Sequence, residues 1–145
     1  MDRRPPRARA VALAAALALP ALLGACAHAA ASLRCEAGAA PMRIERLYFG
    51  TQRPDGGTVS DAEWRTFLDE VVAPAFPDGF TAWDAAGGWR GADQRPVRED
   101  SHVLEVAHDD PAGAGAAIAG VVAAYRARFG QESVMRASMP ACVAF

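Results

Sequence analysis

The chain has 145 residues, of which 52% are hydrophobic and 22% are charged, and its formal net charge is −2 at pH 7. This length suits one domain with a single hydrophobic core. The slight excess of acidic residues argues against binding to nucleic acid and against electrostatic attraction to anionic lipid, because both need a basic surface.

The N-terminal segment has the composition of an export signal. Four arginines among residues 3–9 precede an apolar run from Val11 to Gly24. A helix that crosses a membrane needs roughly 20 apolar residues, so this shorter run is typical of a signal peptide. The residues after position 25 hold 11 arginines and 16 acidic side chains, which is a net charge near −5.

The end of the apolar run offers two processing sites. Leu23-Gly24-Ala25-Cys26 is similar to the lipobox of bacterial lipoproteins, in which the cysteine sulfur receives a diacylglycerol and becomes the new N-terminus. In this interpretation residues 1–25 are the signal peptide, and the exported chain lies in the cell envelope or periplasm, where the lipid on Cys26 anchors it to a membrane. The alternative, Ala27-His28-Ala29, is an A-x-A cleavage site that would release a soluble secreted protein.

One strand and one helix are expected in the first half of the mature chain. Residues 26–41 are rich in small side chains without periodicity, which is typical of a tether. A strand is expected over Met42–Phe49. Ser60 and Glu63 form a capping box, and the helix that follows is stopped by prolines near Ala73–Phe76. Its apolar face comprises Trp64, Phe67, Leu68, Val71, Val72 and Ala75.

Three strands and a second helix are expected in the rest of the chain. They are a strand over Phe80–Arg90, a turn over residues 91–94, a strand over Arg95–His108, a helix between Asp110 and Gly130, and a strand over Ser133–Phe145. The first of these strands is expected to be bulged or bent near Gly87 and Gly88, and the last could break at Pro140. Asp110 favours the start of the helix as an N-cap that is followed by a proline.

The order of these elements is β-α-β-β-α-β, which is the ferredoxin-like pattern. It predicts a single α+β domain over residues 42–145, in which a four-stranded antiparallel sheet carries both helices on one face. The other face is bare in a monomer and must be polar, or covered by a second copy, a partner or a ligand. We therefore expect the function to reside at this bare face.

The alternation of side chains along the strands places a charged pair on the bare face. If Leu104 faces the helices, then Glu105 faces away from them, and the same alternation turns Arg46 and Tyr48 away. The first and third strands are central neighbours in a ferredoxin-like sheet, so Arg46 is expected to pair with Glu105, with Tyr48 alongside.

Further side chains are expected to join this pair. Arg136 comes from the last strand, and Trp83 or Trp89 comes from the second. Such a group could bind a small anionic or carbonyl ligand or orient a proton transfer. The alternative is a salt bridge in a dimer interface or on a wet surface. The candidate ligand-binding residues are therefore Arg46, Tyr48, Glu105 and Arg136.

The histidines of the third strand do not suggest a metal site. His102 and His108 are six residues apart, which is about 20 Å along a strand, so they cannot share one metal ion within a monomer. Neither lies in a Cys/His spacing typical of zinc. We expect no metal and no cofactor, and we expect His108 to form a solvated pair with Asp109.

Two cysteines remain in the mature chain besides Cys26. Cys35 precedes the first expected strand and Cys142 lies in the last, and export would place both in an oxidising compartment. A Cys35–Cys142 disulfide is the favoured expectation. The alternatives are two buried thiols, or a free Cys35 in the tether.

Several motifs point to a known family. The stretches LYFGTQRPDGG, FPDGFT, GWRGADQRPVRED and AYRARFG resemble a family of uncharacterised bacterial exported proteins with a domain of unknown function. The resemblance covers about residues 43–145. It implies export, often with lipoprotein-type signals, and it carries no established activity and no catalytic residues.

Two classes of function are compatible with these observations. The favoured one is a non-enzymatic lipoprotein of the cell envelope, a binding or assembly module whose bare sheet face meets a partner or a second copy. The other is a small enzyme or ligand binder of the dimeric α+β barrel type, with a pocket on the bare face. Whether the protein is an enzyme is not decided by the sequence.

Overall fold

The computed structural model describes residues 33–90 and 94–145. The expected signal peptide, Cys26 and residues 91–93 of the expected turn lie outside the described residues. Leu33–Phe145 form one compact unit that contains every described strand and helix. No helix in this part of the chain is both long and apolar enough to cross a membrane.

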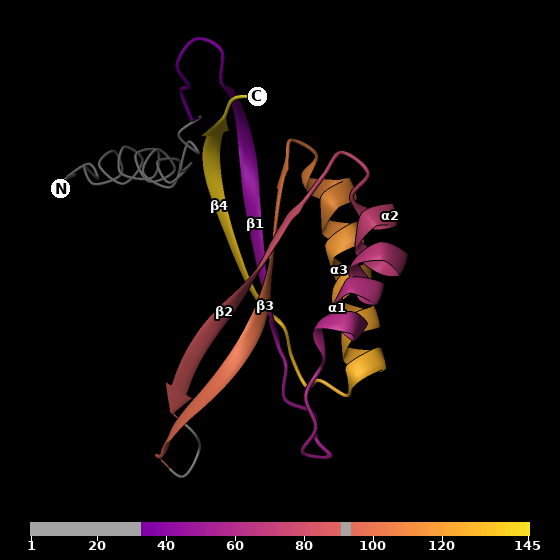
Figure 1. Ribbon diagram of the computed structural model, residues 1–145. Helices are drawn as coiled ribbons and strands as arrows, with labels where there is room; N and C mark the ends of the chain where they lie inside the picture. The colour runs from indigo at the N-terminus through magenta and orange to yellow at the C-terminus, as the bar shows by residue number, and fades with distance from the viewer. Residues whose placement is uncertain (1–32, 91–93) are drawn as a thin grey trace, which may run out of the picture. The chain divides into compact units, whose positions relative to one another are not determined.

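The elements follow the predicted order. They are β1 (Ala40–Gly50), α1 (Asp61–Phe67), the π-helical turn η1 (Leu68–Val72), α2 (Ala73–Ala75), β2 (Thr81–Arg90), β3 (Pro96–His108), α3 (Pro111–Phe129) and β4 (Met135–Val143). Because α1, η1 and α2 follow one another without a gap, they form one helical segment, which corresponds to the first predicted helix (Figure 1).

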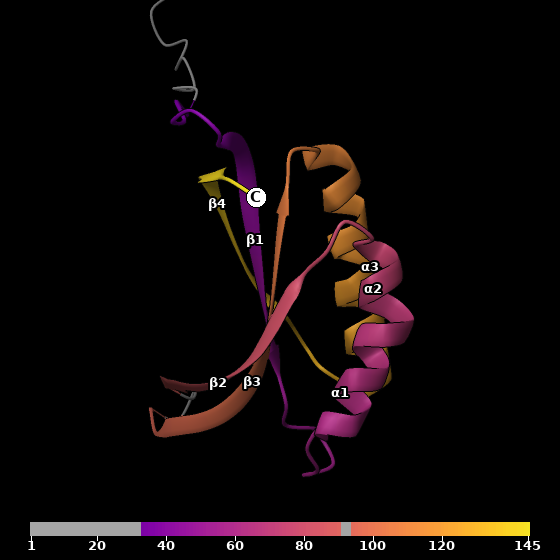
Figure 2. The same ribbon diagram turned by 45° about the horizontal axis from the view of Figure 1, so that its top comes forward.

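The four strands form one antiparallel sheet in the order β2-β3-β1-β4. Both helical segments cover the same face of this sheet, and Figure 2 shows the same arrangement from a second direction. This is the predicted ferredoxin-like α+β fold. We call the face that the helices leave uncovered the open face.

The first helical segment begins and changes pitch for identifiable reasons. The Ser60 side chain accepts a hydrogen bond from Glu63 N–H at 3.3 Å, and a Glu63 carboxylate oxygen accepts one from Ser60 N–H at 3.0 Å. The predicted capping box is therefore present. The π turn η1 ends at Val72, two residues before Pro74, which has no N–H and whose ring would clash with the carbonyl of Glu70 in a regular α-helix.

An aromatic cluster fills the space between the sheet and the helices. Phe49 from β1 packs against Trp64, Phe67 and Tyr125, with ring centroids 4.6–6.2 Å apart. The Tyr125 hydroxyl donates a hydrogen bond to the Gly50 carbonyl at 2.9 Å, and burial raises the pKa of Tyr125 well above its usual range. A buried phenol that is fully packed and hydrogen-bonded joins α3 to the end of β1.

The β2–β3 pair extends beyond the rest of the sheet. Pairing between β1 and β3 ends at Gly50 and Ser101, whereas β2 and β3 stay paired as far as Arg90 and Pro96. The register passes Gly87 and Gly88 without a bulge, so β2 bends here but is not bulged. Figures 1 and 2 show this part of the hairpin curving away from the helices.

The outer strands differ in detail from the prediction. β4 continues through Pro140 without a break, because it is an edge strand and needs hydrogen-bond donors on one side only. β1 begins at Ala40, within the segment expected to be a tether, since Ala40 and Pro41 already pair with Val143 and Cys142.

A disulfide closes this end of the sheet. Cys35 and Cys142 are bonded, with their Cα atoms 5.4 Å apart. The favoured expectation for these two cysteines is thus confirmed. The bond links residues 107 positions apart and therefore encloses almost the whole domain.

Replacing both cysteines by serine (C35S/C142S) in residues 33–145 should lower the free energy of unfolding by about 2–4 kcal/mol, because the cross-link restricts the unfolded chain. Urea unfolding monitored by tryptophan fluorescence measures this change. Wild-type protein treated with a reductant is the matched control and should unfold at the same urea midpoint as the double variant. An unchanged midpoint for both would contradict a stabilising role of the bond.

Candidate functional site

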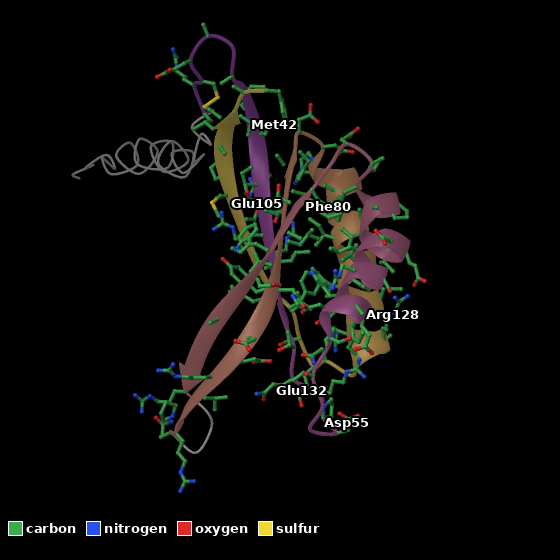
Figure 3. The ribbon with its side chains drawn as sticks, viewed as in Figure 1. Met42, Asp55, Phe80, Glu105, Arg128 and Glu132 are labelled. Carbon is green, nitrogen blue, oxygen red and sulfur yellow. A yellow bond between two sulfur atoms is a disulfide. The ribbon has the colours of Figure 1, made fainter. Side chains whose placement is uncertain are left out.

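The centre of the open face carries an ion pair. Arg46 of β1 lies directly opposite Glu105 of β3, and directly opposed residues of an antiparallel pair project from the same face. Nε and Nη2 of Arg46 donate to Glu105 Oε2 at 2.9 and 2.5 Å. This bond raises the pKa of Arg46 above its usual value. Figure 3 shows Glu105 in the middle of the sheet.

Two aromatic residues flank this pair. Tyr48 and Trp83 lie opposite Val103 from its two sides, so both project from the open face. The guanidinium carbon of Arg46 is 5.5 Å from the centroid of the Trp83 ring, which is within the range of a cation–π interaction. The structure therefore brings Arg46, Tyr48, Glu105 and Trp83 together as expected. Their role in ligand binding stays a prediction.

The rest of the open face is largely apolar. Among the described residues, five large hydrophobic side chains are exposed, and three of them lie here: Trp83 (38% exposed), Met135 (59%) and Met139 (37%). Trp83 lies on one edge strand, and both methionines lie on the other. The open face therefore carries most of the large hydrophobic side chains that are exposed in the described chain, on both sides of the Arg46–Glu105 pair.

Arg136 does not join the group on the open face. It lies opposite Leu47, a core residue, and therefore projects from the helix-covered face. Its Nε donates to Oε2 of Glu45 at 2.8 Å, and Ser138 Oγ donates to Oε1 of the same carboxylate at 2.8 Å. The expectation that Arg136 neighbours Arg46 and Glu105 is corrected, because the β1–β4 register places it on the opposite side of the sheet.

Glu45 is a buried carboxylate that the sequence reasoning missed. Its side chain is 1% exposed, and it is also approached by His108 Nε2 at 3.6 Å and Arg43 Nε at 3.8 Å. The hydrogen bond from Arg136, with that from Ser138, lowers the pKa of Glu45 to about 2 despite the opposing effect of burial. His108 thus neighbours this carboxylate, and the expected solvated pair with Asp109 is replaced by a buried contact.

A second polar arrangement lies in the middle of β3, near the end of its pairing with β1. His102 is 4% exposed, and its Nδ1 is 2.7 Å from Oδ1 of Asp84 on β2. The Trp64 ring stacks on the imidazole, with centroids 4.6 Å apart and planes 4° from parallel. The imidazole Nε2 is buried and has no hydrogen-bond partner. The structure therefore holds His102 firmly from two sides and leaves one of its nitrogens unpaired.

An open groove of about 800 Å³ runs beside this histidine. The wall on one side is the β1–α1 loop with the start of α1, and the wall on the other is the β2–β3 hairpin. The lining residues that can carry charge are Asp61, Asp84, Asp100 and His102. Within residues 33–90 and 94–145, no group of three or more His, Cys, Asp or Glu side chains is arranged to hold a metal ion.

Strand alternation would have located two of the missed residues. Glu45 is two residues before Leu47 on the same strand, so its side chain projects from the same, helix-covered face. Asp84 follows Trp83 directly, so its side chain projects from the opposite face to that of Trp83. A charged side chain at a helix-facing position of a strand needs a partner. That requirement is the signal that could have identified Arg136 and His102 as their neighbours.

Replacing Glu45 by glutamine (E45Q) should destabilise the domain in a pH-dependent way. Because the pKa of Glu45 is lowered from 4.5 to about 2, its contribution is present above pH 4.5 and is lost as the pH falls towards about 2. We expect a loss of about 1–3 kcal/mol at pH 7 and a difference near zero at the acid end. Urea unfolding across this pH range measures both.

The matched control for E45Q is E70Q, which removes an exposed partner of Arg128. Exposed ion pairs contribute about 0–1 kcal/mol, so E70Q should unfold close to the wild type at every pH. A loss that is the same for both variants, or that does not depend on pH, would contradict the role given to Glu45.

Comparison with solved structures shows the fold in other proteins. A phage SAM lyase in complex with S-methyl-5′-thioadenosine superimposes with a TM-score of 0.52 and 13% identity, over 78% of this chain and 95% of that chain. A phage SAM lyase in the apo state gives a TM-score of 0.53 and 14% identity over the same shares. At these identities the likeness shows the fold alone.

Comparison with protein families and with curated proteins gives one match. No curated protein matches the chain. One family covers residues 44–145, nearly the whole of the folded unit, in agreement with the expected domain of unknown function. The chain therefore belongs to the family described as "Protein of unknown function (DUF3574)".

Proposed function

We propose that this protein is a non-enzymatic assembly module of the cell envelope that pairs with a second copy of itself through the open face. The observation that carries the proposal is the exposed apolar surface formed by Trp83, Met135 and Met139 around the Arg46–Glu105 pair. Ferredoxin-like sheets leave this face uncovered, and burying it removes apolar side chains from water.

The charges and the shape of the open face suit a two-fold dimer. In a symmetric dimer the same patch meets itself, so any charged group must meet its opposite across the axis. Arg46 and Glu105 are adjacent and of opposite sign. A two-fold axis that lies between the two sheets and runs parallel to the strands sets β1 of one copy over β3 of the other, so Arg46 of each copy approaches Glu105 of its partner. The same axis sets Trp83 on one edge against Met135 and Met139 on the other edge of the second copy.

The proposed dimer buries side chains of the kinds that often contribute most to binding. A tryptophan is a frequent centre of binding energy, and methionine side chains adapt to the surface they meet. The Arg46–Glu105 pair would lie at the centre and lose its remaining contact with water. The apolar residues would therefore supply affinity, and the charges would fix the orientation of the two copies.

A second candidate function is binding of a small ligand on the same face. The Arg46 guanidinium over the Trp83 ring favours it, because a planar cation beside an aromatic ring can hold an anionic or carbonyl group. The solved neighbour carries S-methyl-5′-thioadenosine, so a ferredoxin-like domain can hold a nucleoside. That compound is a useful probe for this chain.

We also propose that the module is exported and held at a membrane by a lipid on Cys26. The support is the Leu23-Gly24-Ala25-Cys26 pattern at the end of a short apolar run, together with the disulfide at Cys35, which suits an oxidising compartment. In this arrangement the chain between Cys26 and the disulfide is the tether.

Light scattering on residues 33–145 tests the dimer. We expect the molar mass of a dimer for the wild type and at least about tenfold weaker association for M135E, because a carboxylate would be buried in the interface. L33E is the matched control, since Leu33 is exposed but lies outside the sheet. A monomeric wild type, or equal association of M135E and L33E, would overturn the proposed interface.

The variant E105Q separates the two candidate functions on the open face. It keeps the shape of the side chain and removes its charge, so in a dimer it should weaken association by about tenfold or less. If E105Q instead associates like the wild type but loses a thermal shift that S-methyl-5′-thioadenosine produces in the wild type, the face is a ligand site.

Metabolic labelling with an alkyne fatty acid tests the anchor in cells that produce the full chain. The wild type should be labelled and sediment with membranes, and C26S should lose both properties. A29D is the control, because it blocks cleavage at Ala27-His28-Ala29 but leaves the lipobox intact. Release of an unlabelled wild type that A29D abolishes would instead support the secreted form.

A further inference from the structure

The two edges of the sheet differ in how they are protected. Among the described residues, β3 is the only strand beside β2, and β1 is the only strand beside β4. β4 carries Pro140, which cannot donate a hydrogen bond to a further strand. β2 pairs with β3 over all ten of its residues and contains neither a proline nor a bulge. Its unpaired backbone groups can therefore pair with another chain.

The direction of the hydrogen bonds identifies the residues of β2 that face outwards. Thr51 N–H donates to the carbonyl of Asp100, so the backbone groups of Asp100 point from β3 towards the β1 side of the sheet. Those of its neighbour Glu99 then point the other way, to Gly87 of β2. The alternation along β2 therefore directs outwards the N–H and C=O groups of Asp84, Ala86, Gly88 and Arg90.

These outward-facing residues are complementary to a second copy of themselves. Two copies of β2 that pair antiparallel about a two-fold axis at Gly87 set Asp84 opposite Arg90 and Ala86 opposite Gly88. Directly opposed residues project from the same face, so each aspartate meets an arginine. A shift of the pairing by two residues in either direction removes this match. The charges therefore select one register.

Both charged side chains are available for this contact. Asp84 is 77% exposed, and His102 Nδ1 holds its Oδ1 at 2.7 Å, which leaves Oδ2 to accept another hydrogen bond. Arg90 is exposed and donates through Nη1 to the carbonyl of Gln94, so its Nε and Nη2 can donate elsewhere. The outward-facing residues between them are an alanine and a glycine, which let two backbones approach closely.

We propose that β2 pairs edge to edge with β2 of a second copy, antiparallel and centred on Gly87, so that one continuous sheet crosses two subunits. Opposed outward-facing residues exchange backbone hydrogen bonds, and Asp84 forms an ion pair with Arg90 at both ends of the contact. This contact does not use the open face and does not depend on the open-face dimer. It buries mainly polar backbone, so it forms at higher protein concentration than that dimer. The two contacts together extend the proposed module from a pair to a larger assembly.

Disulfide trapping on residues 33–145 tests this register, with G87C as the probe. In the proposed pairing the two copies of residue 87 are directly opposed and are not hydrogen-bonded to each other, with Cα atoms about 4.5 Å apart, which is within the range of a disulfide. A Cβ atom at Gly87 is 3.4 Å from the nearest backbone oxygen, so the substitution fits. With oxidised glutathione as the oxidant, we expect G87C to form a covalent dimer, while Cys35 and Cys142 stay bonded to each other.

A85C is the matched control, because Ala85 lies two residues from Gly87 and projects from the same face. In the proposed register its two copies are four residues, or roughly 14 Å, apart along the strands. This separation is beyond the reach of a disulfide, so A85C should give at least about tenfold less covalent dimer at the same protein concentration. G87C/M135E should cross-link as well as G87C, since the open face takes no part in this contact.

An exchange of charges tests the contact between Asp84 and Arg90. G87C/D84R sets two arginines opposite each other and G87C/R90D sets two aspartates opposite each other, so each protein alone should cross-link about tenfold less than G87C. In a mixture of the two proteins, a heterodimer has opposite charges at both ends of the contact. The heterodimer should therefore be the main covalent product, which mass spectrometry identifies by its mass.

Three results would overturn the proposal. They are equal cross-linking of G87C and A85C, loss of the G87C cross-link when M135E is added, and a charge-exchanged mixture that yields no excess of heterodimer. The first two would show that the trapped contact is unspecific or belongs to the open-face dimer. A wild type that is monomeric at low concentration, with G87C still cross-linked, would contradict the open-face dimer alone.

Discussion

The register between β1 and β3 is the constraint on which both candidate surfaces depend. It sets Arg46 against Glu105 on the open face and Phe49 against His102 on the helix-covered face. A slip of one residue would exchange the two faces, burying the ion pair and exposing the aromatic core. Phe49 resists such a slip, because three aromatic rings from the helices hold it in place. The packing of the core therefore also determines the chemistry of the surface.

Much of the fold and one of the two surfaces follow from local sequence patterns. The capping box at Ser60, the proline after Asp110 and the alternation of side chains in β1 and β3 are properties of short segments, and they were sufficient to predict the element order and the Arg46–Glu105 pair. The two central strands of a ferredoxin-like sheet are neighbours whatever the conformation of the loops. The alternation of side chains along each strand then decides which of them lie on the same face and meet.

The remaining features depend on contacts between distant segments. Arg136 was placed on the wrong face because the register of β4 against β1 is set by the loop after α3 and by the disulfide, neither of which shows in the alternation of β4 itself. The groove needs the bend of the β2–β3 hairpin and the course of the β1–α1 loop together. In the sequence, Trp64 is one member of an apolar helix face. The structure shows that its ring also stacks on His102, which in turn contacts Asp84.

The disulfide also determines how the domain bears mechanical load. Tension applied to the chain before Cys35 passes through the sulfur bridge into β4 as well as along the backbone into β1, so it is shared by two paired strands. Neither strand can be peeled from its end, because the residues that would be pulled away first are cross-linked. The hydrogen bonds between β1 and β4 are then loaded together and not one after another. A domain built in this way can be pulled from its N-terminal side while its sheet, and both surfaces on it, keep their shape.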